Sequence, residues 1–330
     1  MSARVPPPGV YVPSPTFYRP SSEATASSLL QPQVDVQAQA DHSVFLAKSG
    51  IKGLIILGST GEAIHLNRSE RKGLVAGTRK GLDDAGFADY PILAGVLTNG
   101  IDETLEWLND YKEAGAQWGL VLVPGYFGAG ASQENIREWF TIIADNSPLP
   151  ILIYNYPGVT NNVLVTPETY TSLAAHPNIV GCKMSHGNVS HHVQVSLDPK
   201  IDHENFRVFS GFGQQLGPIV VFGAAGVIDG LAAIYPKAVV ALFNAVARVN
   251  EGGDREALKE ARRLQYVVSK AEEFIGKTGV VGIKDAVYRV TGLGENEGGR
   301  LPLKGRLEDG QWEALRGQYL DDIEAEEKKL

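Results

Sequence analysis

The chain is poor in cysteine, in excess positive charge and in long apolar runs. A single cysteine, Cys182, occurs in 330 residues, which excludes an intramolecular disulfide and a metal site built from several thiolates. The net charge is −8, so no broad basic field is available to hold a nucleic-acid backbone or an anionic lipid surface. The longest apolar segments, such as 217–228, are interrupted by glycine and proline and are shorter than the ~20 residues that span a bilayer. We therefore expect neither nucleic acid nor a membrane as a partner.

The N-terminus lacks a recognisable targeting signal. Residues 1–14 are rich in proline and contain neither an apolar signal core nor an arginine-rich amphipathic helix. The last three residues, 328–330, bear only a faint likeness to a peroxisomal address and are better explained as the end of a charged helix. Because a lone cysteine also fits a reducing compartment, the sequence predicts a cytoplasmic protein.

The composition, with 43% hydrophobic and 21% charged residues, is that of an ordinary globular protein. Short apolar runs typical of strands recur along the chain. Most are continuous rather than alternating, as in a parallel sheet that is covered on both faces. The runs are Val10–Val12, Gly53–Leu57, Pro91–Val96, Gly119–Val123, Pro150–Tyr154, Ile179–Lys183, Phe206–Ser210 and Gly226–Gly230.

Helical patterns with recognisable starts lie between these runs. Asn67 is followed by Glu70 at the spacing of a capping box, and Thr166 precedes Pro167 at a first helical position. Further helices are expected over 34–48, 102–114 and 132–146. The alternation of strand and helix predicts an α/β fold, a (β/α)8 TIM barrel. A doubly wound open sheet is the competing architecture, but no G-x-G-x-x-G turn follows the first strand.

After the eighth run only helical patterns remain. Helices are expected over 236–249, 254–275, 279–291 and 310–328. Gly252 and Gly253 supply a break, and 292–302 is predicted to be a loop. The sequence thus predicts that residues 1–252 form the barrel, with the active site, and that residues 253–330 form a C-terminal helical extension.

In such a barrel, reactive side chains lie where the strands end. Lys183 closes a buried run, so its amine would emerge at the barrel mouth. Desolvation lowers the pKa of an amine, and only the neutral amine attacks a carbonyl, so this position favours imine chemistry. On the pattern alone, a lysine that extends to the surface fits the same position equally well. Lys284 is the rival for imine formation, but its segment is expected to be a helix of the extension.

Two tyrosines occur where the fifth run ends. Either Tyr154 or Tyr156 could transfer a proton to or from a substrate, although a packing role is the commoner one for a tyrosine at a strand end. Because side chains alternate along an extended segment, the two tyrosines can lie on the same face. Their spacing therefore does not show which of them is the catalytic one.

Ser59 and Thr60 lie between glycines in the turn after the second run. The backbone amides and hydroxyl groups of such a turn can hold a carboxylate, although an ordinary βα turn would have the same composition. Glu62, in the same turn, is expected to accept hydrogen bonds from loop amides rather than to act as an acid.

Three histidines follow the sixth run, at His186, His191 and His192. Imidazoles bind zinc, but two of these are adjacent, and a loop that leads into a helix explains them better than a metal site. We therefore expect no metal and no bound cofactor.

Together, these residues resemble the family of dihydrodipicolinate synthases and N-acetylneuraminate lyases, the class I aldolases that use pyruvate. The resemblance covers nearly the whole chain and rests on the motifs at 9–17, 58–62, 154–158 and 181–185. It implies a homo-oligomer, either a dimer or a tetramer, and a covalent Schiff base with the substrate instead of a cofactor. The partners implied are a small 2-oxo acid, pyruvate, and an aldehyde.

The resemblance also assigns catalytic roles. Lys183 is implied to form the Schiff base, and Tyr154, the first tyrosine of the family's Tyr-Asn-x-Pro motif, to shuttle the proton. Ser59 and Thr60 correspond to the residues that bind the pyruvate carboxylate, and Thr60 is also expected to be catalytic. Tyr126 corresponds to a relay tyrosine that is provided across a subunit interface.

Further residues are expected to contact the substrate. Ile228 corresponds to a position in the family's pocket beside the imine. Ser185, His186 and Gly211 lie just beyond the sixth and seventh runs, where neutral side chains and backbone can meet the hydroxyl groups of an aldehyde.

Two departures from the family bear on the substrate. Dihydrodipicolinate synthases carry an arginine five residues after the catalytic tyrosine, where this chain has Val159, which cannot bind a second carboxylate. N-acetylneuraminate lyases carry an acidic pair after the seventh strand, where this chain has Gly213 and Gln214. The sequence therefore fits the substrate specificity of neither the dihydrodipicolinate synthases nor the N-acetylneuraminate lyases.

Within the family, the chain most resembles the 2-keto-3-deoxy-L-galactonate aldolases, through residues 154–162 and 181–192. We therefore expect it to cleave a 2-keto-3-deoxy sugar acid to pyruvate and an aldehyde such as glyceraldehyde. Alternatives are a 4-hydroxy-2-oxoglutarate aldolase, a 4-hydroxy-tetrahydrodipicolinate synthase, a metal-dependent aldolase, and a barrel that binds a 2-oxo acid without turning it over.

Overall fold

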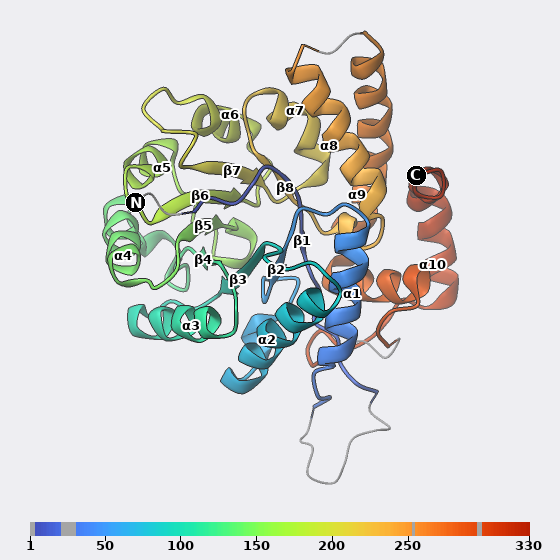
Figure 1. The fold of residues 1–330 in the computed structure, drawn as a ribbon, viewed down its shortest axis with the longest axis horizontal. Coiled ribbons are helices and arrows are strands. Elements are labelled where there is room, and N and C mark those ends of the chain that lie inside the picture. Colours follow the sequence, from blue (N-terminus) through green and yellow to red (C-terminus); the bar gives the residue numbers. More distant parts are fainter. Residues whose placement is uncertain (1–3, 21–30, 253–254, 296–298) are drawn as a thin grey trace.

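The predicted strands are present and form a closed parallel barrel. In the computed structural model, which describes residues 4–20, 31–252, 255–295 and 299–330, the strands pair in chain order and β8 pairs with β1. The strands are β1 (Gly9–Pro13), β2 (Gly53–Ile56), β3 (Ile92–Val96), β4 (Trp118–Leu122), β5 (Ile151–Asn155), β6 (Ile179–Met184), β7 (Arg207–Ser210) and β8 (Gly226–Ile228). Helices surround this barrel in Figure 1, and the (β/α)8 architecture is confirmed.

Each strand is followed by the helix of the same number. These helices are α1 (Val36–Lys48), α2 (Arg68–Asp84), α3 (Ile101–Glu113), α4 (Gln133–Asn146), α5 (Pro167–Ala174), α6 (Val189–Leu197), α7 (Leu216–Val221) and α8 (Pro236–Asn250). The predicted helix starts are confirmed: Asn67 and Glu70 exchange both capping-box hydrogen bonds at 3.0 Å, and Pro167 opens α5. Local signals therefore delimit these helices correctly.

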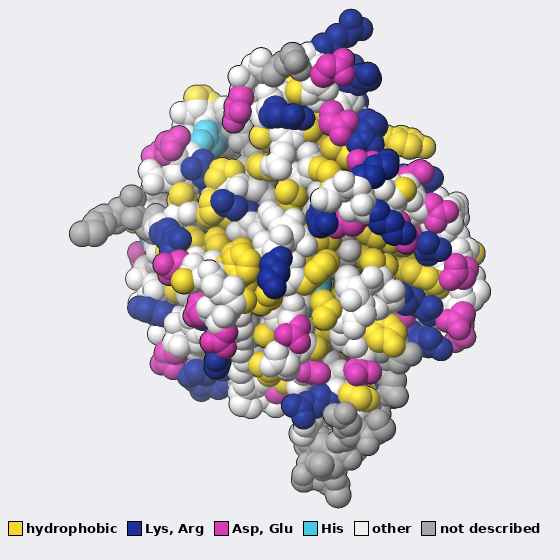
Figure 2. Space-filling model, turned by 45° about the vertical axis from the view of Figure 1, so that its right-hand side comes forward, with side chains coloured by type: hydrophobic (Ala, Val, Ile, Leu, Met, Phe, Trp, Pro, Cys, Tyr) yellow, Lys and Arg dark blue, Asp and Glu magenta, His cyan; other side chains and the backbone are white. Residues whose placement is uncertain are grey.

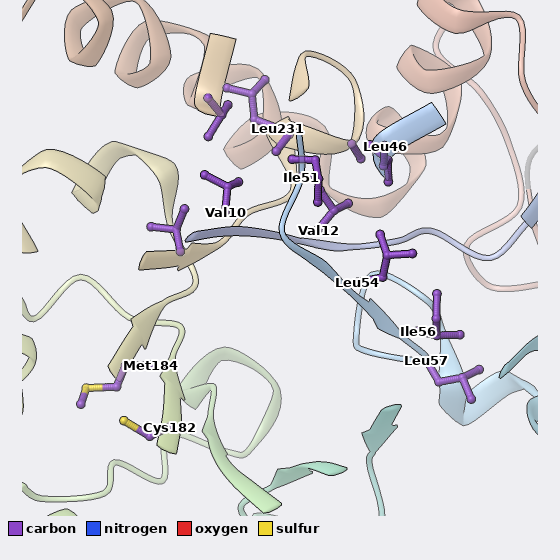
Figure 3. Packing of buried hydrophobic residues seen from close by; sticks show 14 of the residues in the cluster. Val10, Val12, Leu46, Ile51, Leu54, Ile56, Leu57, Cys182, Met184 and Leu231 are labelled. Carbon is purple, nitrogen blue, oxygen red and sulfur yellow. The ribbon is translucent and has the colours of Figure 1, made fainter. Parts of the chain in front are cut away.

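The apolar runs are continuous because the strands are buried on two sides. One cluster fills the barrel interior, with Tyr11, Leu152 and Phe209 among its members. A larger cluster lies between the strands and the helices, and Figure 3 shows part of it, including Val10 and Val12 of β1. Alternate residues of one strand thus enter different apolar layers, as parallel sheets with helices outside require.

Helices alone continue the chain after α8, as predicted. They are α9 (Arg255–Thr291), α10 (Asp309–Leu315) and α11 (Asp321–Glu327), the last two joined by a π-helical turn over Arg316–Leu320. α9 packs against α8 (Figure 1). Gly253 of the predicted break, Asp254 of the predicted helix and residues 296–298 of the predicted loop lie outside the described residues. The division at residue 252 stays a prediction.

α9 contains both helices that the sequence predicts over 254–275 and 279–291. The helix continues through the expected gap and is interrupted only at Gly279, whose φ of 57° and ψ of −150° are not helical. Glycine is the residue that adopts this backbone conformation without strain. The break redirects the chain where it passes over the carboxyl ends of the strands.

The surface agrees with the charge balance of the sequence. On the face in Figure 2, basic and acidic side chains are interspersed rather than separated into fields of one sign. None of the described helices is long and apolar enough to cross a membrane.

Candidate active site

A cavity of about 260 Å³ lies at the carboxyl ends of the strands. Strand ends from around the barrel line it, with Pro13 from β1, Tyr154 from β5, Lys183 from β6 and Ile228 from β8. α9 covers one side, through residues between Glu272 and Ile283. The site therefore forms where the barrel architecture predicts it.

The Lys183 side chain is directed into this cavity although it is only 5% exposed. Burial lowers the pKa of its amine to about 7, against an opposing effect of Asp229. The Nζ atom lies 4.5 Å from the ring centroid of Tyr154. A large fraction of the amine is therefore neutral near pH 7, which is the form that attacks a carbonyl.

A register shift decides which way Lys183 points. The pairing of β5 with β6 moves from Ile179 to Gly181 between neighbouring residues of β5. Val180 belongs to the barrel interior, whereas Cys182 and Met184 belong to the outer cluster (Figure 3). Regular alternation from Val180 would send Cys182 inward and Lys183 outward, so the shift places the amine in the cavity.

Tyr154 is buried at the end of β5, and its hydroxyl lies 3.2 Å from the Ser59 hydroxyl. Burial raises the pKa of Tyr154, and the hydroxyls of Ser59 and Ser185 oppose that rise. The phenol is therefore held neutral, and any phenolate formed during a reaction would be a strong base. Tyr156 also lines the cavity and stacks on Tyr154 at 6.2 Å between ring centroids.

Most of the predicted substrate-contacting residues come together in this cavity. Ser59, Thr60, Ser185, Gly211 and Ile228 all line it. The hydroxyl that contacts Tyr154 belongs to Ser59, however, and in the described part of the chain Thr60 makes no hydrogen bond to Tyr154. That Thr60 is catalytic stays a prediction, and the hydroxyl groups of Ser59 and Ser185 are the ones that lie beside the phenol.

His186 and Tyr126 do not line the cavity of their own subunit. The substrate-binding role of His186 stays a prediction, as does the role of Tyr126 as a relay for another subunit. His186 packs against the rings of His191 and His192, at 5.9 and 5.0 Å between centroids. Tyr126 is 76% exposed, beside Phe127, which is 85% exposed. An exposed relay tyrosine could reach an active site only in another subunit.

The three histidines are not grouped as metal ligands. Both ring nitrogens of His192 face backbone carbonyl oxygens, of Asn188 at 2.8 Å and of Met184 at 3.2 Å. Among the described residues, no group of three or more His, Cys, Asp or Glu side chains is arranged to hold a metal ion. That the reaction needs no metal remains a prediction.

Among the described residues, no loop amide donates to Glu62 as expected, and its carboxylate forms an ion pair with the rival lysine. Its buried carboxylate accepts a hydrogen bond from Lys284 Nζ at 2.7 Å and lies 3.4 Å from the His65 ring. Lys284 is in α9, as predicted, so the pair joins the extension to the turn after β2. An amine held by a carboxylate is a poor nucleophile, which favours Lys183.

The sequence did not reveal several residues in and behind the cavity wall, among them Asp229, Glu272 and Gly279. Asp229 directly follows β8, and the rule that selected the other strand ends could have found it. Glu272 and Gly279 line the cavity from α9, and no strand-end or motif signal marks them. Only the path of the extension brings them to the barrel mouth.

The fold and cavity define a class of (β/α)8-barrel proteins in which a buried lysine lies beside a buried tyrosine at the carboxyl ends of the strands. Within that class, the chain belongs to the dihydrodipicolinate synthetase family, whose sequence profile matches residues 23–316. The resemblance seen in the motifs is thereby confirmed.

Relatives within the family include aldolases. The chain is 33% identical to an L-threo-3-deoxy-hexylosonate aldolase of Hypocrea jecorina, over 96% of each chain. It is 32% identical to an Emericella nidulans protein named "Probable 4-hydroxy-2-oxoglutarate aldolase, mitochondrial", over 97% of this chain and 96% of the relative. Among solved structures, a dihydrodipicolinate synthase family protein from Coccidioides immitis matches with a TM-score of 0.82 and 27% identity, over 100% of both chains.

Proposed function

We propose that this chain is a class I aldolase that cleaves a 2-keto-3-deoxy sugar acid to pyruvate and an aldehyde such as glyceraldehyde. The observation that carries the proposal is the buried amine of Lys183 inside the cavity, with its pKa lowered to about 7 and its Nζ atom 4.5 Å from the ring centroid of Tyr154. Such a pair supplies both the electrophilic activation and the proton transfer that aldol cleavage requires.

The reaction begins when neutral Lys183 attacks the C2 carbonyl of the substrate. Tyr154 protonates the carbinolamine hydroxyl, which leaves as water, and the resulting iminium cation lies beside the phenolate. The phenolate then takes the proton of the C4 hydroxyl while the C3–C4 bond breaks. The electrons of that bond move into the iminium group to give an enamine, and the C4 fragment leaves as the aldehyde. Tyr154 returns that proton to C3, and hydrolysis of the iminium releases pyruvate.

Other residues hold the substrate during these steps. Ser59 and Thr60 bind the carboxylate next to the reacting carbonyl, and Ser59 also receives and returns the proton of Tyr154. Ile228, Ser185 and Gly211 form the wall around the imine. Hydrogen bonds from these residues to the substrate are stronger in such a buried site than they would be in water.

The aldehyde portion is proposed to be uncharged. Val159 is 50% exposed and does not line the cavity, so it offers no contact to a second carboxylate. A 4-hydroxy-2-oxoglutarate aldolase is the second candidate, favoured by the name of the Emericella nidulans relative. A 4-hydroxy-tetrahydrodipicolinate synthase would need a cation for the carboxylate of its second substrate.

We further propose a homo-oligomer in which one subunit supplies Tyr126 to the cavity of its partner, and a reaction without metal or cofactor. Treatment with a chelator should then leave turnover unchanged.

The compartment proposed is the cytoplasm, supported by the single buried cysteine, Cys182. Imaging of a fluorescent fusion would test this, and a mitochondrial pattern would contradict it.

Two measurements test the central proposal. Borohydride reduction in the presence of pyruvate should add one reduced adduct, which peptide mass spectrometry should locate on Lys183. An adduct on Lys284 would contradict the assignment. In a substrate panel, kcat/KM for a 2-keto-3-deoxy hexonate should exceed that for condensation of pyruvate with aspartate semialdehyde by at least ~10²-fold, because a buried unpaired carboxylate costs several kcal/mol.

A further inference from the structure

Two carboxyl groups that take no part in the proposed mechanism lie beside the cavity, Glu272 in its wall and Asp229 behind that wall. Asp229, directly after β8, is 1% exposed, and Glu272, in α9, is 6% exposed and lines the cavity. Burial raises the pKa of both groups, and their mutual interaction raises that of Glu272 further. Neither belongs to an ion pair among the described residues, so their position beside the cavity needs another explanation.

The two carboxyl groups meet at Gly213, in the turn after β7. A Cβ atom on Gly213 would lie 2.5 Å from Oε1 of Glu272 and 3.1 Å from Oδ1 of Asp229, so these oxygens occupy the space that a side chain would take. Both atoms are buried. The two carboxyl groups interact with each other and with the backbone of Gly213. The other Asp229 oxygen, Oδ2, accepts from the Ala232 amide at 3.2 Å.

Two buried carboxylates this close together do not both ionise, so the pair holds one proton and keeps one negative charge. With the shared proton between the two groups, the carboxyl group of Glu272 offers acceptor oxygens to the cavity. These acceptors match sugar hydroxyl groups, each of which can donate a hydrogen bond. The pair opposes a second substrate carboxylate, which would meet a fixed negative charge in a low-dielectric wall.

The pair lies on the side of the barrel where the end of a substrate remote from its carboxylate would lie. Ser59 and Thr60 follow β2, whereas Gly213 follows β7, and β1 and β8 separate the two strands in the barrel. A substrate joined to Lys183 through C2, with its carboxylate at Ser59 and Thr60, directs its remaining carbons away from β2. Lys183 is the only Lys or Arg among the described residues that line the cavity, and the imine occupies it.

We propose that the Asp229 and Glu272 pair determines the specificity of the aldehyde half of the cavity: Glu272 binds hydroxyl groups there, Asp229 positions it from behind, and the charge of the pair excludes a second carboxylate. The inference rests on the proposed function and selects among its candidate substrates. It favours a polyhydroxy 2-oxo acid over 4-hydroxy-2-oxoglutarate, because cleavage of the latter yields an aldehyde that carries a carboxylate.

Variants of the pair test this specificity. The ratio of kcat/KM for 2-keto-3-deoxy-L-galactonate to that for 4-hydroxy-2-oxoglutarate should fall at least ~10-fold in Glu272→Gln and in Asp229→Asn. The sugar acid should lose rate in both variants, and the dicarboxylate should lose less or gain. Glu273→Gln is the matched control, since Glu273 is the next residue of α9 and is exposed, and its ratio should equal that of the wild type.

Ratios within ~2-fold of the wild type in both pair variants would overturn the inference. Borohydride trapping of pyruvate by each variant, before the kinetics, reports whether it folds and still forms the imine. Should neither variant fold, competition in the wild-type enzyme decides: condensation of pyruvate should proceed faster with glyceraldehyde than with glyoxylate, and the reverse order would overturn the inference.

The two levels of failure are distinguishable. A wild-type enzyme that traps no pyruvate contradicts the proposed function itself. A wild-type enzyme that traps pyruvate, but whose selectivity does not depend on the pair, contradicts only the role of Asp229 and Glu272.

Discussion

The lowered pKa of Lys183 comes from the barrel wall rather than from a neighbouring base. Burial lowers the pKa of its amine to about 7, and the charge of Asp229 acts in the opposite direction. Because the Asp229 and Glu272 pair retains a proton, its opposing charge is limited to one unit. Desolvation therefore determines how much neutral amine is present.

The pH dependence of imine formation follows from this shift. The amine is protonated below the lowered pKa and neutral above it, so the rate of pyruvate trapping should rise as pH increases through about 7 and then level off. Initial rates of borohydride-trapped adduct, measured from pH 5.5 to 9.5, would check this. A rate that continued to rise towards pH 10 would contradict a desolvated amine.

The two tyrosines at the end of β5 should differ in their effect on turnover. Tyr154→Phe should lower kcat by ~10²-fold to 10⁴-fold, because it removes the hydroxyl that exchanges protons with Ser59 and the substrate. Tyr156→Phe should lower kcat by less than ~10-fold, since stacking on Tyr154 needs only the ring. Steady-state kinetics of both variants would test this, and an exchange of the two effects would reverse the assignment.

At the scale of elements, α9 completes a site that the eight strands leave open on one side. Its first part contributes Glu272, and beyond the break at Gly279 it contributes Ile283 to the cavity wall. The ion pair of Lys284 with Glu62 holds the second part against the turn after β2. The position of α9 is therefore coupled to the turn that carries Ser59 and Thr60.

Gly279 should matter for stability through its backbone alone. A Cβ atom there meets nothing within 4 Å, but the φ of 57° with ψ of −150° is accessible without strain only to glycine. Gly279→Ala should therefore destabilise the protein by ~1 to 3 kcal/mol. Gly276→Ala is the matched control, because its Cβ also has open space but its backbone is helical, and it should be neutral or stabilising by ~0.5 to 1 kcal/mol.

Urea unfolding midpoints of the two variants and the wild type would measure this difference. Equal midpoints for Gly279→Ala and Gly276→Ala would show that the break in α9 carries no backbone requirement for glycine.

At the scale of the whole molecule, the proposed role of Tyr126 would link catalysis to assembly. Tyr126 and Phe127 are highly exposed neighbours, with their rings 5.2 Å apart, and large exposed aromatic side chains commonly mark an interface. A tyrosine that is absent from its own cavity can serve as a relay only in a partner's cavity. The proposed oligomer is thus also a proposal about the active site.

Subunit complementation would test that proposal. Lys183→Ala subunits lack the nucleophile, and Tyr126→Phe subunits lack the relay, so each homo-oligomer should be weakly active. Mixed oligomers contain sites with Lys183 from one subunit and Tyr126 from the other, and these should regain up to about half of the wild-type activity per subunit. Sedimentation velocity would check that the mixed subunits assemble. If the activity of the mixture then equals the mean of the activities of the two single-variant oligomers, a shared site is excluded.

Local patterns in the chain were sufficient for the order and type of the elements. Continuous apolar runs such as Ile151–Tyr154, separated by capped helices, predict a barrel because such strands must be covered on both faces. The rule that barrels carry their chemistry at strand ends then selected Lys183, Tyr154, Ser59 and Thr60, and all four line the cavity. These features depend on side-chain type and short spacing, which a sequence contains.

Three-dimensional packing was needed for the orientation and partners of those side chains. A register shift in β6 turns Lys183 inward, the contact with Tyr154 falls to Ser59 instead of Thr60, and Asp229 meets Glu272 across 43 positions of the chain. Pairing register and the path of α9 depend on contacts between residues far apart in the sequence, whose energies no local window contains. For this reason the location of the site follows from the sequence, whereas the side-chain contacts that support the proposed proton relay and the proposed specificity pair follow from the fold.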